Sequence, residues 1–208
     1  MSEFMLEPVL EEIGALRSGH FLLASGRHSD RYVEKFELLR RPRLVEAACA
    51  ELLRRLPWRE IDVVAGPTTG GILLAYELAR QLGVRAAYAE RAEAGAAQRV
   101  FRRGTTFPEG ARVLVVDDIL TTGGSVRETL AALREYPVAV LGAAVLVDRS
   151  TTPVDLGVPL IALARLEIAS WDASECPLCQ EGIPLVKPGT SAPERAASQH
   201  AGTSPERP

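Results

Sequence analysis

The chain has 208 residues, of which 47% are hydrophobic, 25% charged and 5% aromatic. This composition is typical of one folded globular domain and excludes a chain that is disordered throughout. The 24 basic and 27 acidic residues give a net charge of −3, which offers no concentrated basic face for nucleic acid. No apolar run reaches the roughly 18 residues of a membrane span. Because the first residues are acidic, they do not resemble a secretory signal, and the sequence predicts a cytoplasmic protein.

The N-terminal part is expected to form two helices separated by a small covering lobe. Apolar residues at helical spacing predict a helix over Leu6–Leu16, with Gly19 beyond its end. Residues 20–39 alternate in short stretches broken by Ser25-Gly26, a pattern typical of a hairpin. Pro42–Leu56 is predicted to be an amphipathic helix that begins at its proline.

Further along the chain, short apolar runs alternate with helical patterns. The predicted elements are strand Ile61–Ala65, helix Gly70–Leu82, strand Arg85–Ala89, strand Arg112–Val116, helix Ser125–Glu135 and strand Val138–Val147. Strands of this kind between helices indicate an α/β fold, with a central, mostly parallel sheet flanked by helices. Residues 90–108 are predicted to be a long surface loop, and residues 190–208, which lack periodicity, a disordered tail.

The most informative stretch is Val113–Val126, a buried strand followed by two carboxylates, a Thr/Gly loop and the start of a helix. Asp117 and Asp118 come at the carboxyl end of the strand, where open α/β sheets bind ligands. The loop amides and hydroxyls at a helix start predict a phosphate cradle, and Ser125-x-x-Glu128 fits a capping box. Because two carboxylates would repel a phosphate, we expect them to bind neutral hydroxyls, such as those of a ribose whose 5′-phosphate lies in the loop.

Other chemistries fit this stretch less well. Two acids after a buried strand also occur in P-loop nucleotide hydrolases, but the only lysines, Lys35 and Lys187, lie outside any glycine-rich loop. No G-x-G-x-x-G follows a strand, which argues against a dinucleotide-binding fold. A strand–turn–helix with a purely structural role is the remaining alternative.

The chain has three cysteines, an odd number that does not suit a disulfide framework. Cys49 falls in a predicted helix, and Cys176-Pro-Leu-Cys179 forms a C-x-x-C pair. A structural zinc site needs four ligands, and the sequence contains no second pair. Because His20, His28 and His200 are distant in sequence, a buried or turn-forming cysteine pair is favoured over a metal site.

The stretch Val113–Val126 resembles the phosphoribosyl-pyrophosphate (PRPP) signature of type I phosphoribosyltransferases, and the resemblance extends over most of the chain to the orotate phosphoribosyltransferase family. Four further segments are similar to parts of that family: Gly19–Tyr32 to the segment that covers the base, Ala65–Ile72 to the pyrophosphate loop, Val147-Asp148-Arg149 to the strand end whose arginine meets the orotate carboxylate, and Cys176–Leu185 to a C-terminal segment of some members.

The resemblance implies a type I phosphoribosyltransferase fold in one domain, residues 1–189, with a small hood lobe. The hood would come mainly from residues 1–40, with 165–187 as a further contributor. The implied reaction transfers the 5-phosphoribosyl group from PRPP to orotate and gives orotidine 5′-monophosphate and pyrophosphate. The resemblance also implies Mg²⁺ held mainly by PRPP with no direct protein ligand, and a homodimer that shares the 90–108 loop across its interface.

The resemblance also implies roles for particular residues. Asp117, Asp118 and Arg91 are expected to be catalytic and to contact PRPP. The other expected PRPP contacts are Thr68, Thr69, Gly70, Gly71, Ile119, Leu120, Thr121, Thr122, Gly123, Gly124 and Ser125. Orotate is expected to contact Thr121 and Arg149.

The chain departs from the family pattern at three places. Ala24 and Gly70 stand where the family commonly carries lysines. Residues 90–103 correspond to the family's mobile loop and contain neither lysine nor histidine. Arg91 is the best positional replacement for the cation of that loop; the further candidates are Arg99, Arg102 and Arg103. Two alternatives therefore stay open, a phosphoribosyltransferase for another base and a PRPP-sensing regulator that has lost turnover. Arg149 disfavours the first, and the lack of an added DNA-binding element disfavours the second.

Overall fold

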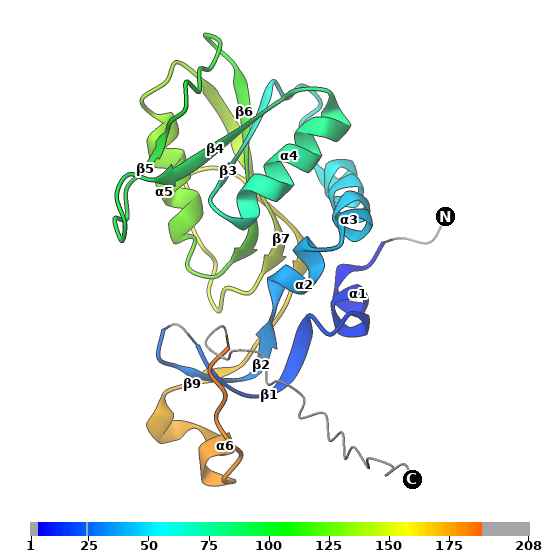
Figure 1. Cartoon of the computed structure of the whole chain (residues 1–208), viewed down its shortest axis with the longest axis vertical. Helices are drawn as coiled ribbons and strands as arrows, with labels where there is room; N and C mark the ends of the chain where they lie inside the picture. Colours follow the sequence, from blue (N-terminus) through cyan, green and yellow to red (C-terminus); the bar gives the residue numbers. More distant parts are fainter. Residues whose placement is uncertain (1–3, 24, 189–208) are drawn as a thin grey trace, which may run out of the picture.

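The computed structural model describes residues 4–23 and 25–188, so Ala24 and the predicted tail over 190–208 lie outside the described residues. A six-stranded sheet with helices forms the larger part of the molecule, and a three-stranded sheet lies below it (Figure 1). In chain order the elements are α1 Leu6–Glu12, β1 Leu16–Leu22, β2 His28–Val33, α2 Lys35–Leu39, α3 Pro42–Arg55, β3 Val63–Pro67, α4 Gly70–Leu82, β4 Arg85–Arg91, β5 Arg99–Phe101, β6 Arg112–Leu120, α5 Gly124–Leu133, β7 Ala139–Asp148, β8 Leu160–Arg165, β9 Ser170–Trp171, the 3₁₀ turn Ala173–Glu175 and α6 Pro177–Gln180.

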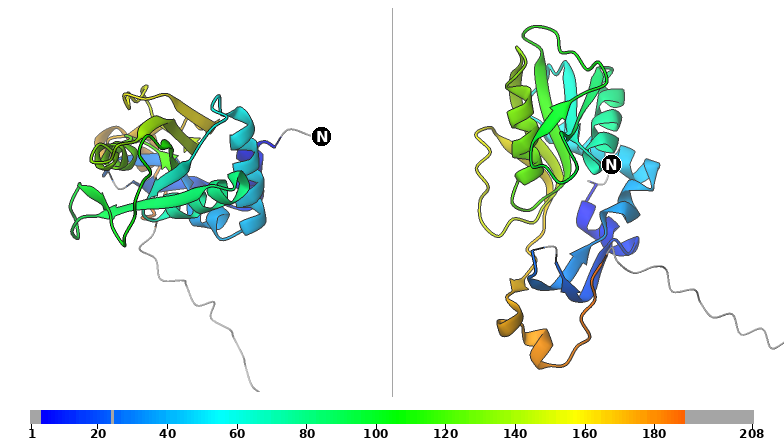
Figure 2. Two further views of the ribbon diagram at one scale, coloured as in Figure 1. Left: turned by 90° about the horizontal axis from the view of Figure 1, so that it is seen from above. Right: turned by 60° about the vertical axis from the view of Figure 1, so that its left-hand side comes forward.

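The larger sheet has the strand order β5-β4-β3-β6-β7-β8, and all its strands are parallel except β5. Side chains alternate across it: Val113 and Val115 of β6 pack into the core beneath α5, whereas Leu114 and Val116 pack into the core beneath α3 and α4. Figure 2 shows these helices on the two faces of the sheet. The predicted α/β fold with a central, mostly parallel sheet is confirmed, and the double coverage explains why its strands are continuously apolar.

The chain connections diverge between two neighbouring strands of this sheet. β3 leads through α4 to β4 on one side, and β6 leads through α5 to β7 on the other. In open α/β sheets, ligands bind outside the carboxyl ends of the strands at such a point. The two loops that leave β3 and β6 therefore mark the expected place of the functional site.

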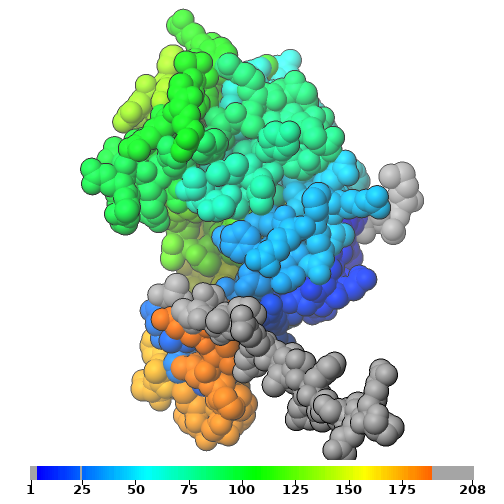
Figure 3. All heavy atoms as spheres, viewed as in Figure 1, coloured from blue at the N-terminus to red at the C-terminus, as the bar shows by residue number. Residues whose placement is uncertain are grey.

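The smaller sheet is built from both ends of the described chain. β1 and β2 form an antiparallel hairpin, which confirms the hairpin predicted within residues 20–39, and β9 pairs with β2. The chain then returns to β1, where the Val186 amide donates to the His20 carbonyl at 2.8 Å. We call β1, β2, β9 and the segment 172–187 the hood; Figure 3 shows its C-terminal part, in orange, at the bottom of the molecule.

The predicted ends of α1 and β6 are each wrong by four residues. α1 ends at Glu12 instead of Leu16, because Gly14 takes a left-handed φ of 68° and β1 follows. β6 continues to Leu120, so the two carboxylates lie within the end of the strand and not after it.

The segment 90–108 is only partly a loop. β4 continues to Arg91, and β5 pairs with it as an antiparallel hairpin at the edge of the sheet. Phe101 of β5 is buried, and its ring lies 5.0 Å from that of Phe107 and 5.7 Å from that of Tyr136. This aromatic cluster anchors the base of the hairpin. Within the described residues, no helix combines the length and the apolar character needed to cross a bilayer.

Candidate active site

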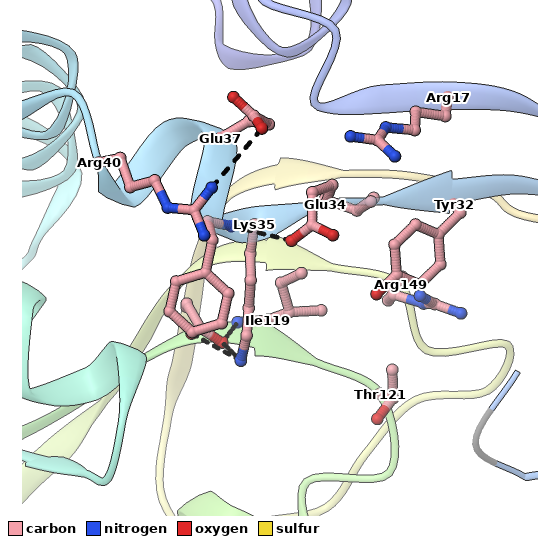
Figure 4. Close-up of a pocket in the computed structure, with 12 residues that line it drawn as sticks. Arg17, Tyr32, Glu34, Lys35, Glu37, Arg40, Ile119, Thr121 and Arg149 are labelled. Carbon is pink, nitrogen blue, oxygen red and sulfur yellow. Dashed lines mark hydrogen bonds and ion pairs between the residues drawn. The ribbon is translucent and has the colours of Figure 1, made fainter. Parts of the chain in front are cut away.

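A cleft of about 910 Å³ opens between the hood and the carboxyl ends of the larger sheet (Figure 4). Its walls come from β1, β2 and α2 on one side and from the ends of β6 and β7 on the other. The lining residues are Arg17, Tyr32, Val33, Glu34, Lys35, Phe36, Glu37, Arg40, Asp118, Ile119, Thr121 and Arg149. A second cavity, of about 360 Å³, shares Tyr32, Thr121 and Arg149 with the first. The two cavities therefore meet at these three side chains.

Asp117 lies beneath the floor of the cleft and organises the loop that follows β6. Its carboxylate is buried and accepts hydrogen bonds from Ser125 Oγ at 2.5 Å and from the Asp118 amide at 2.8 Å. Burial, and then the charge of the neighbouring Asp118, raise the pKa of Asp117 to about 6. Both effects thus favour the neutral form of the Asp117 carboxyl group.

The predicted capping box at the start of α5 is wrong. The residue before the helix is Gly123, with a left-handed φ of 77°, and no side chain caps it. Ser125 donates to Asp117 instead, and Glu128 pairs with Arg99 at 3.0 Å. Both partners of the predicted box are therefore used in tertiary contacts that tie α5 to β6 and β5.

Asp118 is the carboxylate that faces the cleft. Its Oδ1 atom accepts from the Ile119 amide at 2.6 Å and from Lys35 Nζ at 3.1 Å, and Lys35 Nζ lies 2.9 Å from its other oxygen. Lys35 was not predicted as a site residue, although it is one of only two lysines in the chain. That scarcity was the one available signal, because α2 carries no recognisable motif.

Gly70 is required where α4 meets the end of β6. A Cβ atom at this position would lie 1.6 Å from Oδ2 of Asp118, so no other residue fits while the carboxylate keeps its place. With Asp118 in this place, a lysine side chain at Gly70 has no room. The cation beside Asp118 comes from α2 instead, as Lys35.

The Thr/Gly loop over residues 121–125 has the form of a phosphate cradle. Thr121 and Thr122 are exposed, and α5 begins directly behind them. The Arg127 guanidinium donates to the Thr122 carbonyl at 2.5 Å and holds the loop against the helix. The free amides at the start of this ten-residue helix favour an anion.

Arg149 enters the cleft from the end of β7. The side chain is half-buried, and loss of contact with water lowers the pKa of its guanidinium. Among the residues that the structure describes, no carboxylate lies within ion-pair distance of it. Figure 4 shows Arg149 beside Tyr32 and above Thr121. A desolvated guanidinium without an anionic partner suits an anionic ligand.

The loop arginines lie in two different surroundings. Arg99 is buried and donates to Thr68 Oγ1 at 2.9 Å, Glu128 Oε2 at 3.0 Å and the Ala89 carbonyl at 3.2 Å. It thereby fixes the loop after β3 to the hairpin and to α5. Arg91, Arg102 and Arg103 are exposed on the hairpin; their guanidinium groups contact the Ala96 carbonyl, the Ala92 carbonyl and Glu90, respectively.

The C-x-x-C pair lies in the hood, outside the cleft. The fold places His20 and His28 beside Cys176 and Cys179, with their ligand atoms all within 4.8 Å of one another. The argument that these histidines are too distant in sequence to join the cysteines is therefore wrong. β1 and β2 carry the histidines to the C-terminal segment, an arrangement that no local pattern reveals.

Residues 37–158 match the family model of the phosphoribosyl transferase domain. The chain is 48% identical over 182 residues to the orotate phosphoribosyltransferase of Caldicellulosiruptor bescii, an alignment that covers 88% of this chain and 94% of that one. It is 50% identical, with the same coverage, to that of Pelotomaculum thermopropionicum. The crystal structure of orotate phosphoribosyltransferase from Aeropyrum pernix matches with a TM-score of 0.68 and 33% identity over 78% of this chain and 94% of that one. The chain thus belongs to the orotate phosphoribosyltransferase family, enzymes of pyrimidine biosynthesis that transfer the 5-phosphoribosyl group from PRPP to orotate.

Proposed function

We propose that the cleft between the hood and the larger sheet is where this chain converts PRPP and orotate into orotidine 5′-monophosphate and pyrophosphate. The observation that carries the proposal is that three groups lie together at this cleft. These are the carboxylate pair at the end of β6, the Thr/Gly loop at the start of α5, and the unpaired guanidinium of Arg149. Each group matches one part of the two substrates.

The ribose 5-phosphate part of PRPP would lie across the Thr/Gly loop. The amides of residues 121–125 and the hydroxyls of Thr121 and Thr122 would hold the 5′-phosphate. Asp118, which faces the cleft, and Asp117 beneath it would accept hydrogen bonds from the ribose hydroxyls. Holding the ring at these points leaves C1 of the ribose open to attack. Catalysis would then rest mainly on positioning as the ribose gains oxocarbenium character.

Orotate would bind where the two cavities meet. The fixed fork of the Arg149 guanidinium suits the orotate carboxylate, which it can hold through two parallel hydrogen bonds. Tyr32 from the hood and Thr121 from the loop line the same place. Uracil lacks the carboxylate and would leave the half-buried guanidinium unpaired, so Arg149 would also select the base.

The departing pyrophosphate would meet the loop after β3. Thr68, Thr69, Gly70 and Gly71 precede or begin α4, whose first amides favour an anion. Lys35 lies at the same edge of the cleft through its contact with Asp118. Arg91 would supply a further cation from the exposed hairpin of a second copy of the chain. We therefore propose a homodimer that shares the 90–108 segment across its interface.

Magnesium would enter with PRPP. Asp117 already accepts from Ser125, and Asp118 already pairs with Lys35, so the cleft offers no cage of free carboxylates. This donor set fits a Mg²⁺ ion that is coordinated mainly by substrate oxygens and water. When bound there, Mg²⁺ would neutralise charge on the pyrophosphate leaving group.

The proposed domain organisation follows from this cleft. Residues 1–189 would form one phosphoribosyltransferase domain, with residues 1–40 and 165–187 supplying the lobe that covers the base. We place the protein in the cytoplasm, because PRPP and orotate are charged molecules that do not cross a bilayer unaided.

The test is to incubate the purified full chain with PRPP and Mg²⁺ and, separately, with orotate, uracil, adenine, hypoxanthine and xanthine. We expect consumption of orotate alone, with pyrophosphate released in equal amount. Consumption of another base with orotate untouched would identify a different phosphoribosyltransferase. PRPP binding by calorimetry without turnover of any base would indicate the regulator.

A further inference from the structure

Four side chains with metal-binding atoms converge in the hood. His20 comes from β1, His28 from β2, and Cys176 and Cys179 from the start of α6. His20, His28 and Cys176 are buried, at 2%, 5% and 0% exposure, whereas Cys179 lies at the surface. Three of the four side chains are therefore shielded from solvent, and solvent reaches the cluster at Cys179.

Four of the six separations among these atoms are close to those of a tetrahedral site, and all six are within 4.8 Å. Zinc binds nitrogen at about 2.0–2.1 Å and thiolate sulfur at about 2.3 Å, which separates two nitrogens by about 3.3 Å and a nitrogen from a sulfur by about 3.6 Å. His20 Nε2 lies 2.9 Å from His28 Nδ1 and 3.4 Å from Cys176 Sγ. Cys179 Sγ lies 3.3 Å from His28 Nδ1 and 3.7 Å from His20 Nε2. Each of these separations is within about half an ångström of the tetrahedral value.

The hydrogen bonding of His20 prepares its other nitrogen for a metal. His20 Nδ1 lies 2.7 Å from the Ile183 carbonyl, which can only accept, so Nδ1 carries the proton. In the neutral ring the lone pair is then on Nε2, which points at the other three atoms. A backbone carbonyl on the far nitrogen is the usual partner of a metal-binding histidine, because it fixes both the tautomer and the orientation of the ring.

The segment that carries the cysteines buries little apolar surface. From residue 172 to residue 187, Cys176 is the one buried residue, and Ile183, Leu185 and Val186 are exposed. The hydrogen bonds of Val186 with β1 tie its far end, but no apolar core lies beneath the rest. Small units that cannot bury enough apolar surface are commonly stabilised by a structural metal.

We propose that His20 Nε2, His28 Nδ1, Cys176 Sγ and Cys179 Sγ bind one Zn²⁺ ion that fastens the C-terminal segment to the β1–β2 hairpin. Two nitrogens and two sulfurs in tetrahedral spacing select zinc over Mg²⁺ or Ca²⁺, which prefer oxygen. On binding, each cysteine loses its thiol proton to water and binds as a thiolate. With four protein ligands, no position remains for water or substrate, so the ion is structural.

The zinc site would act on the cleft through the strands it joins. β1 carries Arg17 and β2 carries Tyr32, and both side chains line the cleft. Fixing the ends of these strands in the hood would hold the wall of the cleft that covers the base. The ion is thus a positioning element and takes no part in the transfer itself.

The first experiment measures bound metal in the full chain, expressed without a histidine tag and dialysed against a weak chelator. Elemental analysis should find about one zinc per chain in the wild type. Cys176→Ser and His28→Asn should each lower the zinc content at least about tenfold. Cys49→Ala is the matched control: it also removes one buried thiol, but from α3, and should retain the zinc.

The second experiment uses only the wild-type protein, so it does not depend on how well a variant folds. The wild-type metal is removed with a strong chelator under reducing conditions, and Co²⁺ is added back. We expect the intense visible bands of tetrahedral cobalt together with thiolate-to-cobalt charge transfer in the near ultraviolet. Zinc should displace the cobalt and abolish both. Limited proteolysis should cut within residues 172–187 only after chelation.

Two results would overturn the proposal. One is a wild-type protein that contains no zinc and gives only the weak, pink spectrum of octahedral cobalt. The other is a Cys176→Ser/Cys179→Ser variant that binds zinc as the wild type does. Neither result depends on the transfer activity.

Discussion

Lys35 Nζ lies 2.9 Å from Oδ2 of Asp118, although the two residues are 83 positions apart in the chain. The Asp118 side chain is only 5% exposed, whereas that of Lys35 is 38% exposed and reaches into the cleft. The pair joins α2 to the end of β6 and places a cation beside the carboxylate proposed to hold the ribose.

We expect Lys35→Met to lower kcat/KM for PRPP by tenfold to a hundredfold, about 1.4–3 kcal/mol. The methionine keeps the apolar stem but leaves Asp118 unpaired and removes a cation from the path of the pyrophosphate. The matched control is Arg43→Met, which removes an exposed cation of α3 and should keep the wild-type value. Steady-state kinetics with PRPP varied would make the comparison. Equal kcat/KM values in the two variants would remove Lys35 from the site.

Gly70→Ala should abolish detectable turnover and lower the melting temperature, because its Cβ would lie 1.6 Å from the Asp118 carboxylate. If that contact is the cause, Asp118→Ala should relieve most of the thermal penalty of Gly70→Ala. Melting curves of the wild type, the two single variants and the double variant form the required cycle. Additive losses in the double variant would show that the alanine clashes with something else.

The raised pKa of Asp117 predicts a pH-dependent stability. Its ordinary value of 3.8 rises to about 6 in the folded chain, so the folded state binds more protons than the unfolded state within that window. The free energy of unfolding should therefore fall as pH rises through the window, by up to about 3 kcal/mol from this group. Asp117→Asn should lose this component. Urea unfolding at each end of the window measures the free energy of unfolding of the wild type and of Asp117→Asn. If this free energy changed with pH equally in the two proteins, the raised pKa of Asp117 would be contradicted.

Arg149→Gln should raise the KM for orotate more than the KM for PRPP. Losing a bidentate contact to a carboxylate costs about 1.5–3 kcal/mol, which corresponds to roughly tenfold to 150-fold. The preference for orotate over uracil should shrink by a similar factor. Arg43→Ala, which removes an exposed arginine of α3, serves as the control. A variant with unchanged selectivity would place the orotate carboxylate elsewhere.

Arg91→Ala should lower kcat tenfold to a thousandfold, about 1.4–4 kcal/mol, with a smaller effect on the KM for orotate. If the hairpin serves a second copy of the chain, mixing the impaired Arg91→Ala and Asp118→Asn proteins should give more activity than either has alone. Full activity in Arg91→Ala would transfer the role to another loop arginine.

Arg99→Ala should instead lower the melting temperature, because it leaves Glu128 and Thr68 without their shared partner.

The features that could be predicted from the sequence are those formed by residues that follow one another in the chain. Strand, carboxylates, loop and helix follow one another within Val113–Val126, so their order alone indicates the site. The role expected for Arg149 came from the resemblance of Val147-Asp148-Arg149 to the family, because a lone arginine after an apolar strand does not by itself indicate a ligand. Lys35 was missed because its role depends on a contact across 83 residues, and β5 because three residues carry too little periodicity. The capping box failed because Ser125 and Glu128 have stronger tertiary partners.

The C-x-x-C pair shows the same limit at longer range. Cys176 and His20 are separated by 156 positions, and only the pairing of both chain ends in the hood places them together. A local pattern contains no information about such a contact. The sequence therefore showed the cysteine pair directly, but it could not show that two of the three histidines lie beside that pair.

The hood also sets an order of events during synthesis. Its first two strands leave the ribosome at the beginning, but β9 and the segment up to Val186 leave only after the whole larger sheet. While the core folds, the β1–β2 hairpin therefore lacks β9 at its edge and the two cysteines beside its histidines. Closing so long a loop is slow and entropically costly. Assembly of the wall proposed to cover the base would then be the last step of folding, and a nascent chain would form the proposed PRPP site before it could hold orotate.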